Sequence, residues 1–145
     1  VTAAIRTREV SAHVSQVSSH AAVRAEMVRM QRRMAEGRDM VVEGRDVGTV
    51  VFPAARAKFF ITASVTERAE RRHREMIKEG YRVSLETVRQ DMVRRDRMDV
   101  TRAVNPLRRA PDAELIDTTG QSVILVVERL LRRVSERLEE KGEKG

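Results

Sequence analysis

The spacing of apolar residues predicts helices at both ends of the chain. Over residues 8–35 an apolar residue recurs every three or four positions, which is the period of an α-helix. Ser18-Ser19-His20 interrupts that stripe and predicts a break with a new amino-terminal cap. A final helix is predicted from about Ser122, followed by a solvated, frayed tail over 139–145. We expect it to bury the apolar residues of its stripe, which are Ile124, Val127, Leu131, Val134 and Leu138.

Three short apolar segments predict buried strands between these helices. They cover residues 40–43, 57–62 and 113–117. Two further helices are predicted between the second and third strands, one over 66–79 and one capped by Ser84. Strands that alternate with helices predict a parallel sheet covered on both sides, so the expected fold class is α/β.

The helix capped by Ser84 changes from apolar to charged along a single face. The apolar stripe and its charged continuation at the same spacing are Leu85, Val88, Met92 and Arg95, Asp99, Arg102. A helix that only packed on a core would stay apolar there. One interpretation is a ladder of ion pairs, each worth about 0.3–0.5 kcal/mol when exposed. The other is that this end of the helix faces a cleft with a polar ligand.

An arginine and an aspartate stand between two glycines directly after the first predicted strand. The segment is Gly44-Arg45-Asp46-Val47-Gly48. Glycine lets the backbone turn sharply and lets a ligand approach closely. In open α/β sheets, ligands bind beyond the carboxyl ends of the strands, which is where this pair falls. The alternative interpretation is an exposed ion pair in a turn.

The charge distribution favours a phosphate-bearing ligand. The 145 residues carry a net charge of +7, and residues 68–109 contain 13 basic and 7 acidic side chains. Arginine makes planar, bidentate contacts with phosphate oxygens, so a concentrated arginine segment suits a nucleotide. A solvated helical face is the alternative interpretation of the same segment.

Composition also excludes several classes of protein. There is no cysteine, which excludes a disulfide framework and a thiolate zinc site. No apolar run approaches the ~20 residues of a membrane span, and the start has no signal-peptide pattern, so we expect a soluble cytoplasmic protein. The three histidines, His13, His20 and His73, have no metal-binding or catalytic spacing, and we expect them at the surface with no metal site in this chain.

Three motifs together resemble the carboxyl-terminal two-thirds of bacterial-type cytidylate (CMP) kinases. The most specific is Gly44–Pro53, G-R-D-V-G-T-V-V-F-P, and the second is Arg94–Pro106, R-R-D-R-M-D-V-T-R-A-V-N-P. The third combines Ile5-Arg6-Thr7, Ser15-Gln16-Val17 and Val23-Arg24, in which Arg6 matches a family arginine without an assigned contact. The resemblance covers nearly all of the chain. The family's phosphate-binding loop, G-x-x-x-x-G-K-[ST], is not in these residues.

The resemblance implies an incomplete fold of the P-loop nucleoside-monophosphate-kinase type. Residues 1–145 would form the carboxyl-terminal part of that domain, with an arginine-rich helical lid over about 68–109. Two further strands and the phosphate loop would lie upstream of Val1. The complete protein would be a transferase of pyrimidine metabolism that moves a phosphoryl group from ATP to CMP or dCMP with Mg²⁺.

The same resemblance implies which partners the protein has. They would be the nucleotides alone, with no nucleic acid and no membrane, and the complete protein would be a monomer. This chain would supply much of the CMP site and the lid, and would be inactive by itself.

The resemblance also assigns roles to individual residues. Seven of them would bind CMP: Ser15, Arg24 and Asp46 at the cytosine, Arg95 and Asp99 at the pentose, and Arg45 and Arg102 at the monophosphate and base. Three arginines of this set, Arg45, Arg95 and Arg102, would also be catalytic. Two arginines on the helix over 66–79 would reach the phosphates of ATP, namely Arg71 and Arg72.

The chemistry of cytosine suits these residue types. Asp46 can accept a hydrogen bond from the N4 amino group, while arginine and serine donate to N3 and O2. Uracil presents O4 to the same carboxylate and is repelled. Phosphoryl transfer itself requires in-line positioning, Mg²⁺ and positive charge rather than a covalent nucleophile.

Two other classes of function remain open. An inactive nucleotide-binding or interaction module could keep this fold without a phosphate loop. A basic nucleic-acid binder fits less well, because one Tyr, three Phe and no Trp are too few for a stacking platform. A glycine-rich loop ending in Gly-Lys-Ser/Thr upstream of Val1 would decide for the kinase.

Overall fold

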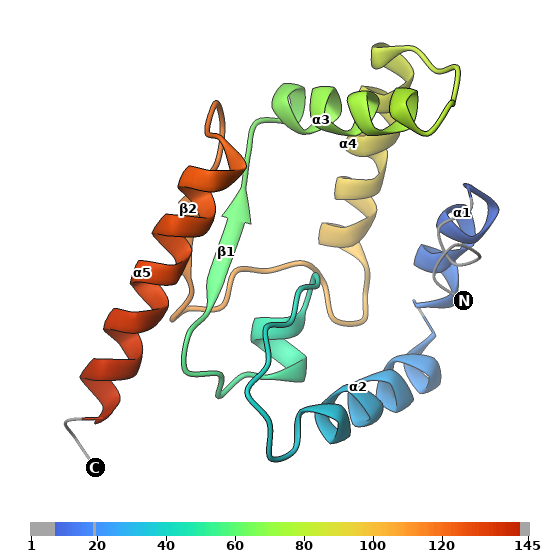
Figure 1. Ribbon diagram of the computed structural model, residues 1–145. Helices are drawn as coiled ribbons and strands as arrows, with labels where there is room; N and C mark the ends of the chain where they lie inside the picture. Colours follow the sequence, from blue (N-terminus) through green and yellow to red (C-terminus); the bar gives the residue numbers. More distant parts are fainter. Residues whose placement is uncertain (1–7, 19, 143–145) are drawn as a thin grey trace. The chain divides into compact units, whose positions relative to one another are not determined.

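The computed structural model describes residues 8–18 and 20–142 (Figure 1). In chain order the elements are α1 (Arg8–Val17), α2 (Ala21–Ala35), the π-helix η2 (Val47–Val51), β1 (Phe59–Thr62), α3 (Val65–Lys78), α4 (Leu85–Thr101), β2 (Glu114–Asp117) and α5 (Val123–Gly142). Helices and a small parallel sheet confirm the α/β class, and the end of α1 at Val17 confirms the predicted break before α2. None of the described helices is long and apolar enough to cross a membrane.

The chain divides into two compact units. The first contains residues 1–53 and 98–108, and the second contains residues 54–97 and 109–145. The first unit holds α1, α2 and η2 together with the last turn of α4. The second holds the sheet, α3, α5 and the rest of α4.

The second unit is built on two parallel strands. β1 pairs with β2 in a register that sets Phe59 opposite Glu114 and Thr62 opposite Asp117. α5 runs alongside β2 (Figure 1). The core lies where the strands meet the helices, with Ile116 wholly buried and Ala69 of α3 only 1% exposed.

Local capping explains where the helices of the second unit begin and end. The Ser64 hydroxyl accepts a hydrogen bond from the Glu67 amide at 3.2 Å, and Ser84 accepts one from the Thr87 amide at 3.1 Å. Gly80 has a φ of +86°, the left-handed conformation that stops a helix at low cost. The helices predicted over 66–79 and after Ser84 are confirmed.

The predicted strand over 40–43 is wrong. These residues form no strand, and Val41 is fully exposed. A strand needs a neighbour for its backbone N–H and C=O groups, and among the described residues only β1 and β2 pair. An apolar run by itself supplies no such neighbour.

The predicted burial of the α5 stripe is also wrong. Val134 is half-buried, but Ile124 is 70% exposed and Leu131 is 63% exposed. Val127 and Leu138 are exposed as well. The face of α5 that meets the sheet lies beside this stripe and carries Arg133 and Arg137, both of which bind Glu114. Two strands are too narrow to cover a second line of residues on the helix.

Candidate functional site

Helix α2 and the π-helix η2 bring an arginine and an aspartate together in the first unit. Arg24 lies in the first turn of α2, and Asp46 directly precedes η2. The Arg24 Nη2 atom pairs with the Asp46 Oδ2 atom, and Asp46 is only 5% exposed. Two residues that are 22 positions apart in the chain therefore form a buried ion pair.

The backbone around Asp46 is closely packed. Its carbonyl oxygen accepts hydrogen bonds from the Val50 amide at 2.8 Å and the Val51 amide at 3.3 Å, and the second of these starts the wide turn of η2. A Cβ atom at Gly44 would lie 2.6 Å from a methyl group of Val47. Glycine is therefore needed at residue 44 because of crowding, and the predicted tight glycine turn has a steric cause at that position.

A second buried carboxylate, that of Asp99, lies near the end of α4. Asp99 is 6% exposed, and its Oδ2 atom is 3.0 Å from Arg45 Nε. The two charges attract at this distance, but their geometry makes no hydrogen bond, so Asp99 Oδ2 has no hydrogen-bond partner among the described residues. The Asp99 carbonyl oxygen accepts from the Leu107 amide at 2.7 Å, which folds the following loop back onto the helix end.

Arg102 is held by that loop. Its Nε atom donates to the Asn105 carbonyl oxygen at 2.6 Å, and Asn105 adopts a φ of +50°, which asparagine tolerates better than most residues. The Nη2 atom of Arg102 is buried and has no hydrogen-bond partner in the described part of the chain. One edge of the guanidinium is thus fixed, and the other edge is left to donate.

Unpartnered buried polar atoms make this unit the candidate binding site. Besides Asp99 Oδ2 and Arg102 Nη2, Arg24 Nε lacks a hydrogen-bond partner within the residues described. Buried polar groups in folded proteins are nearly always hydrogen-bonded, so such exceptions call for an absent partner. Gln31 Oε1 on α2 is a fourth such atom, so the described part of this unit holds two unused donors and two unused acceptors. Such a set suits a ligand that both accepts and donates hydrogen bonds.

The structure brings together five of the seven residues predicted to bind CMP. Arg24, Arg45, Asp46, Asp99 and Arg102 all belong to the first unit. Ser15 lies on α1 in the same unit, but its side chain is outside the described part of the structure. Arg95 is exposed on the part of α4 that belongs to the second unit, and its role stays a prediction. Arg6 is outside the described residues.

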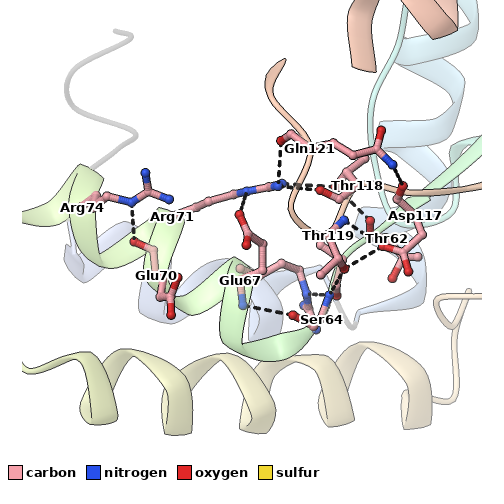
Figure 2. Close-up of polar contacts among 12 residues, drawn as sticks. Thr62, Ser64, Glu67, Glu70, Arg71, Arg74, Asp117, Thr118, Thr119 and Gln121 are labelled. Atoms are coloured by element: carbon pink, nitrogen blue, oxygen red, sulfur yellow. Dashed lines mark hydrogen bonds and ion pairs between the residues drawn. The ribbon is translucent and has the colours of Figure 1, made fainter. Parts of the chain in front are cut away.

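The two arginines predicted to reach ATP differ in their surroundings, and Figure 2 shows those of Arg71. Arg71 donates to Glu67 Oε1 at 2.8 Å and to the Thr118 carbonyl oxygen at 2.7 Å. Thr118 in turn donates to the Thr62 carbonyl oxygen at 2.9 Å, so Arg71 ties α3 to the carboxyl ends of both strands. Arg72 is exposed and pairs with Glu75 on its own helix. Phosphate binding by either arginine stays a prediction.

Next to Arg71, the loop after β2 is ordered by Asp117. The Asp117 carboxylate accepts hydrogen bonds from the Thr119 hydroxyl at 2.7 Å and the Thr119 amide at 2.8 Å, and both lower the pKa of Asp117. The Thr119 hydroxyl also accepts from the Ser64 amide at 2.9 Å. This polar cluster fixes the carboxyl ends of β1 and β2 relative to each other (Figure 2).

The arginines with defined contacts that the sequence did not single out include one beside η2 and one between α3 and α4. Arg32 on α2 donates to the carbonyl oxygens of η2, and Arg68 on α3 pairs with Asp96 on α4 at 2.7 Å. Arg32 belongs to the Gln31-Arg32-Arg33 run at the end of α2, and its neighbour Arg33 has the same local context. No local signal in the sequence separates Arg32 from Arg33.

Two of the three histidines lie at the surface as predicted, and the third is partly buried. His13 and His20 are exposed, whereas His73 is half-buried with its Nε2 atom 3.0 Å from the Val83 carbonyl oxygen. Among the described residues, no three side chains of the metal-binding types gather at one place.

Comparisons with known proteins agree with the motifs. A family model described as cytidylate kinase matches residues 1–136. The cytidylate kinase of Halalkalibacterium halodurans is 50% identical over 138 residues, which cover 95% of this chain and 62% of the relative. That of Shouchella clausii is 47% identical over 94% of this chain and 60% of its own length.

A third relative gives the same coverage. The cytidylate kinase of Bacillus subtilis is 46% identical over 137 residues, which cover 94% of this chain and 61% of the relative. The chain therefore spans about three fifths of the length of the curated relatives it matches.

Proposed function

Because the chain belongs to the cytidylate kinase family, we propose that the complete protein transfers a phosphoryl group from ATP to CMP or dCMP. The observation that carries this proposal is the buried Arg24–Asp46 pair, in which Arg24 Nε is left without a partner among the described residues. A buried carboxylate beside an unused buried donor matches the edge of a cytosine ring, which has an amino donor next to acceptor atoms.

The pair supports recognition of the base by complementary hydrogen bonds. One carboxylate oxygen of Asp46 holds Arg24, which leaves the other to accept from the N4 amino group of cytosine. Arg24 Nε would donate to N3 or O2. Uracil carries a carbonyl where cytosine has its amino group, so it would leave a buried carboxylate unpaired and repelled.

Two further unpartnered atoms, one acceptor and one donor, suit the sugar and the phosphate of the nucleotide. Asp99 Oδ2 can accept from a sugar hydroxyl, and Arg102 Nη2 can donate to a phosphate oxygen. Arg45 is about half exposed, so the outer part of its guanidinium can bind a phosphate while its Nε atom stays beside the buried Asp99 carboxylate. Asp99 would position the sugar, and Arg45 and Arg102 would hold the monophosphate and spread positive charge around it, which is the main requirement of phosphoryl transfer.

ATP and Mg²⁺ complete the proposed reaction. Mg²⁺ is usually held through substrate phosphates, waters and one or two carboxylates, and it would neutralise charge on the transferred group. Among the described residues, no three side chains of the metal-binding types lie together. Nucleotides as the only partners, a monomeric state and a cytoplasmic location stay predictions.

The proposal is tested by comparing CMP with UMP in the complete protein. We expect kcat/KM for CMP to exceed that for UMP by at least about a hundredfold, the discrimination available when a buried polar group is left unpaired. A coupled nucleoside-diphosphate assay measures both rates. Equal efficiency for the two nucleotides would overturn base recognition, and tight CMP binding without turnover would identify an inactive nucleotide-binding module.

A further inference from the structure

The carboxyl-terminal end of η2 is held by one side chain from α2. Arg32 Nη2 donates to the Val50 carbonyl oxygen at 2.7 Å, and Arg32 Nε donates to the Val51 carbonyl oxygen at 2.9 Å. The last carbonyl groups of a helix have no partner within the helix, so they need donors from elsewhere. A guanidinium supplies two N–H groups in a fixed fork, which sets the orientation of both carbonyls.

The same peptide groups connect Arg32 to Asp46. The Val50 carbonyl and the Val51 amide belong to one peptide, and that amide donates to the Asp46 carbonyl oxygen at 3.3 Å. The Val51 carbonyl and the Phe52 amide form the next peptide, and that amide donates to the Val47 carbonyl oxygen at 2.8 Å. A charged donor on one side of a peptide strengthens the hydrogen bond on its other side. Arg32 therefore stabilises the turn that begins at Asp46.

Helix α2 thus holds the short η2 segment at both ends. Arg24 in its first turn binds the Asp46 side chain, and Arg32 in its last turn binds the final carbonyl groups of η2. The two arginines are eight residues apart, a rise of ~12 Å along a rigid helix. This fixed spacing restricts how Asp46 can rotate or shift relative to Arg24.

We propose that Arg32 is a positioning residue for base selection, which acts through η2 on the orientation of the Asp46 carboxylate. The inference rests on the proposed function, because it concerns selection between CMP and UMP at the same site. Arg32 touches neither nucleotide. It keeps the carboxylate where an amino group is accepted and a carbonyl oxygen is repelled.

The test uses Arg32→Ala, Arg32→Lys and the control Arg33→Ala in the complete protein. Arg33 is the next residue on α2, carries the same charge, and makes no hydrogen bond to η2 in the described part of the chain. For Arg32→Ala we expect the ratio of kcat/KM for CMP to that for UMP to fall about tenfold or more, since two hydrogen bonds from a charged group are lost. The change should appear as a raised KM for CMP, with kcat at saturating CMP nearly unchanged.

The other variants separate positioning from general stabilisation. Lysine keeps the charge but cannot hold both carbonyls in a fixed fork, so Arg32→Lys should show an intermediate ratio at the wild-type melting temperature. Arg33→Ala should keep the wild-type ratio. If Arg32→Ala fails to fold, the CMP-to-UMP ratio of kcat/KM in the Arg32→Lys variant tests the inference.

Two results would overturn the inference. One is a wild-type CMP-to-UMP ratio in the folded Arg32 variants, and the other is an equal loss of efficiency with both nucleotides. A wild-type protein without any preference for CMP would instead overturn the proposed function, and the role of Arg32 with it.

Discussion

The carboxylate of Asp99 is buried beside the guanidinium of Arg45, yet its Oδ2 atom accepts no hydrogen bond from the residues described. A buried charge without full pairing destabilises a protein unless a ligand completes it. The neighbouring arginine is half exposed, so it offsets only part of the desolvation of Asp99. At the scale of single residues, a ligand role for Asp99 is therefore a prediction that substitution can test.

Replacement of Asp99 separates a ligand role from an ion-pair role. We expect Asp99→Ala to weaken CMP binding by about 1.5–3 kcal/mol, the worth of a hydrogen bond to a charged group, with the melting temperature nearly unchanged. Isothermal titration calorimetry and thermal unfolding of the complete protein measure the two quantities. Asp91→Ala is the control, because Asp91 is an exposed aspartate of α4 that pairs only locally with Arg94. A large fall in melting temperature with unchanged CMP affinity would show that Asp99 serves the fold instead.

At the scale of elements, α5 is attached to the sheet by charge as well as by packing. Arg133 and Arg137 bind the Glu114 carboxylate on β2, and the Arg137 guanidinium lies 5.5 Å from the centroid of the Phe59 ring on β1. Burial raises the pKa of Glu114, but hydrogen bonds and charge from the two arginines outweigh it and lower the pKa below its ordinary value. The contact between α5 and the sheet therefore depends on Glu114, a carboxylate that becomes protonated at acidic pH.

A lowered pKa in the folded state makes stability depend on pH. The contribution of Glu114 is complete above its unfolded pKa, about 4.3, and is lost as pH falls through the lower folded pKa. We expect the free energy of unfolding to fall below about pH 4, and to fall less steeply in an Arg133→Gln variant. Urea unfolding at several pH values measures this. Arg132→Gln removes the same charge from the next residue and should keep the wild-type slope, and equal slopes in all three proteins would exclude Glu114 as a cause.

At the scale of the whole molecule, the chain forms two compact units and spans about three fifths of its curated relatives. The arginine-rich segment over about 68–109 contributes α3 and most of α4 to the second unit and residues 98–108 to the first. Some of its arginines form exposed pairs with acidic residues of the same helix, as in the Arg89–Glu86 and Arg94–Asp91 pairs. Exposed pairs of this kind contribute little stability, so phosphate can replace them at low cost.

This segment should behave as a lid in the complete protein. We expect fast backbone hydrogen exchange over residues 68–109 without nucleotides, and strong protection when CMP and a non-hydrolysable ATP analogue are bound, because closure excludes water and phosphate draws the arginines together. Exchange in α5 should change little and serves as the internal reference. Equal protection of the segment in both states would mean a rigid helical subdomain.

Local sequence determined most of the helices of this protein. The break before α2, the serine cap of α4 and the stop at Gly80 all depend on residues within one helical turn, and each was predicted. The motifs likewise identify the family and single out Arg45, Asp46, Asp99 and Arg102. Such features can be recognised because their physical cause lies close to them in the chain.

Tertiary structure decided what depends on distant partners. Residues 40–43 are apolar enough for a strand, but a ladder needs a neighbour, and α5 has an apolar stripe that two strands do not cover. Arg32 and Arg33 look alike in the sequence, and only the fold of α2 against η2 gives one of them two carbonyl groups to hold. Pairing and burial are interactions between segments far apart in the chain, so their energies cannot be assigned until the fold brings those segments together.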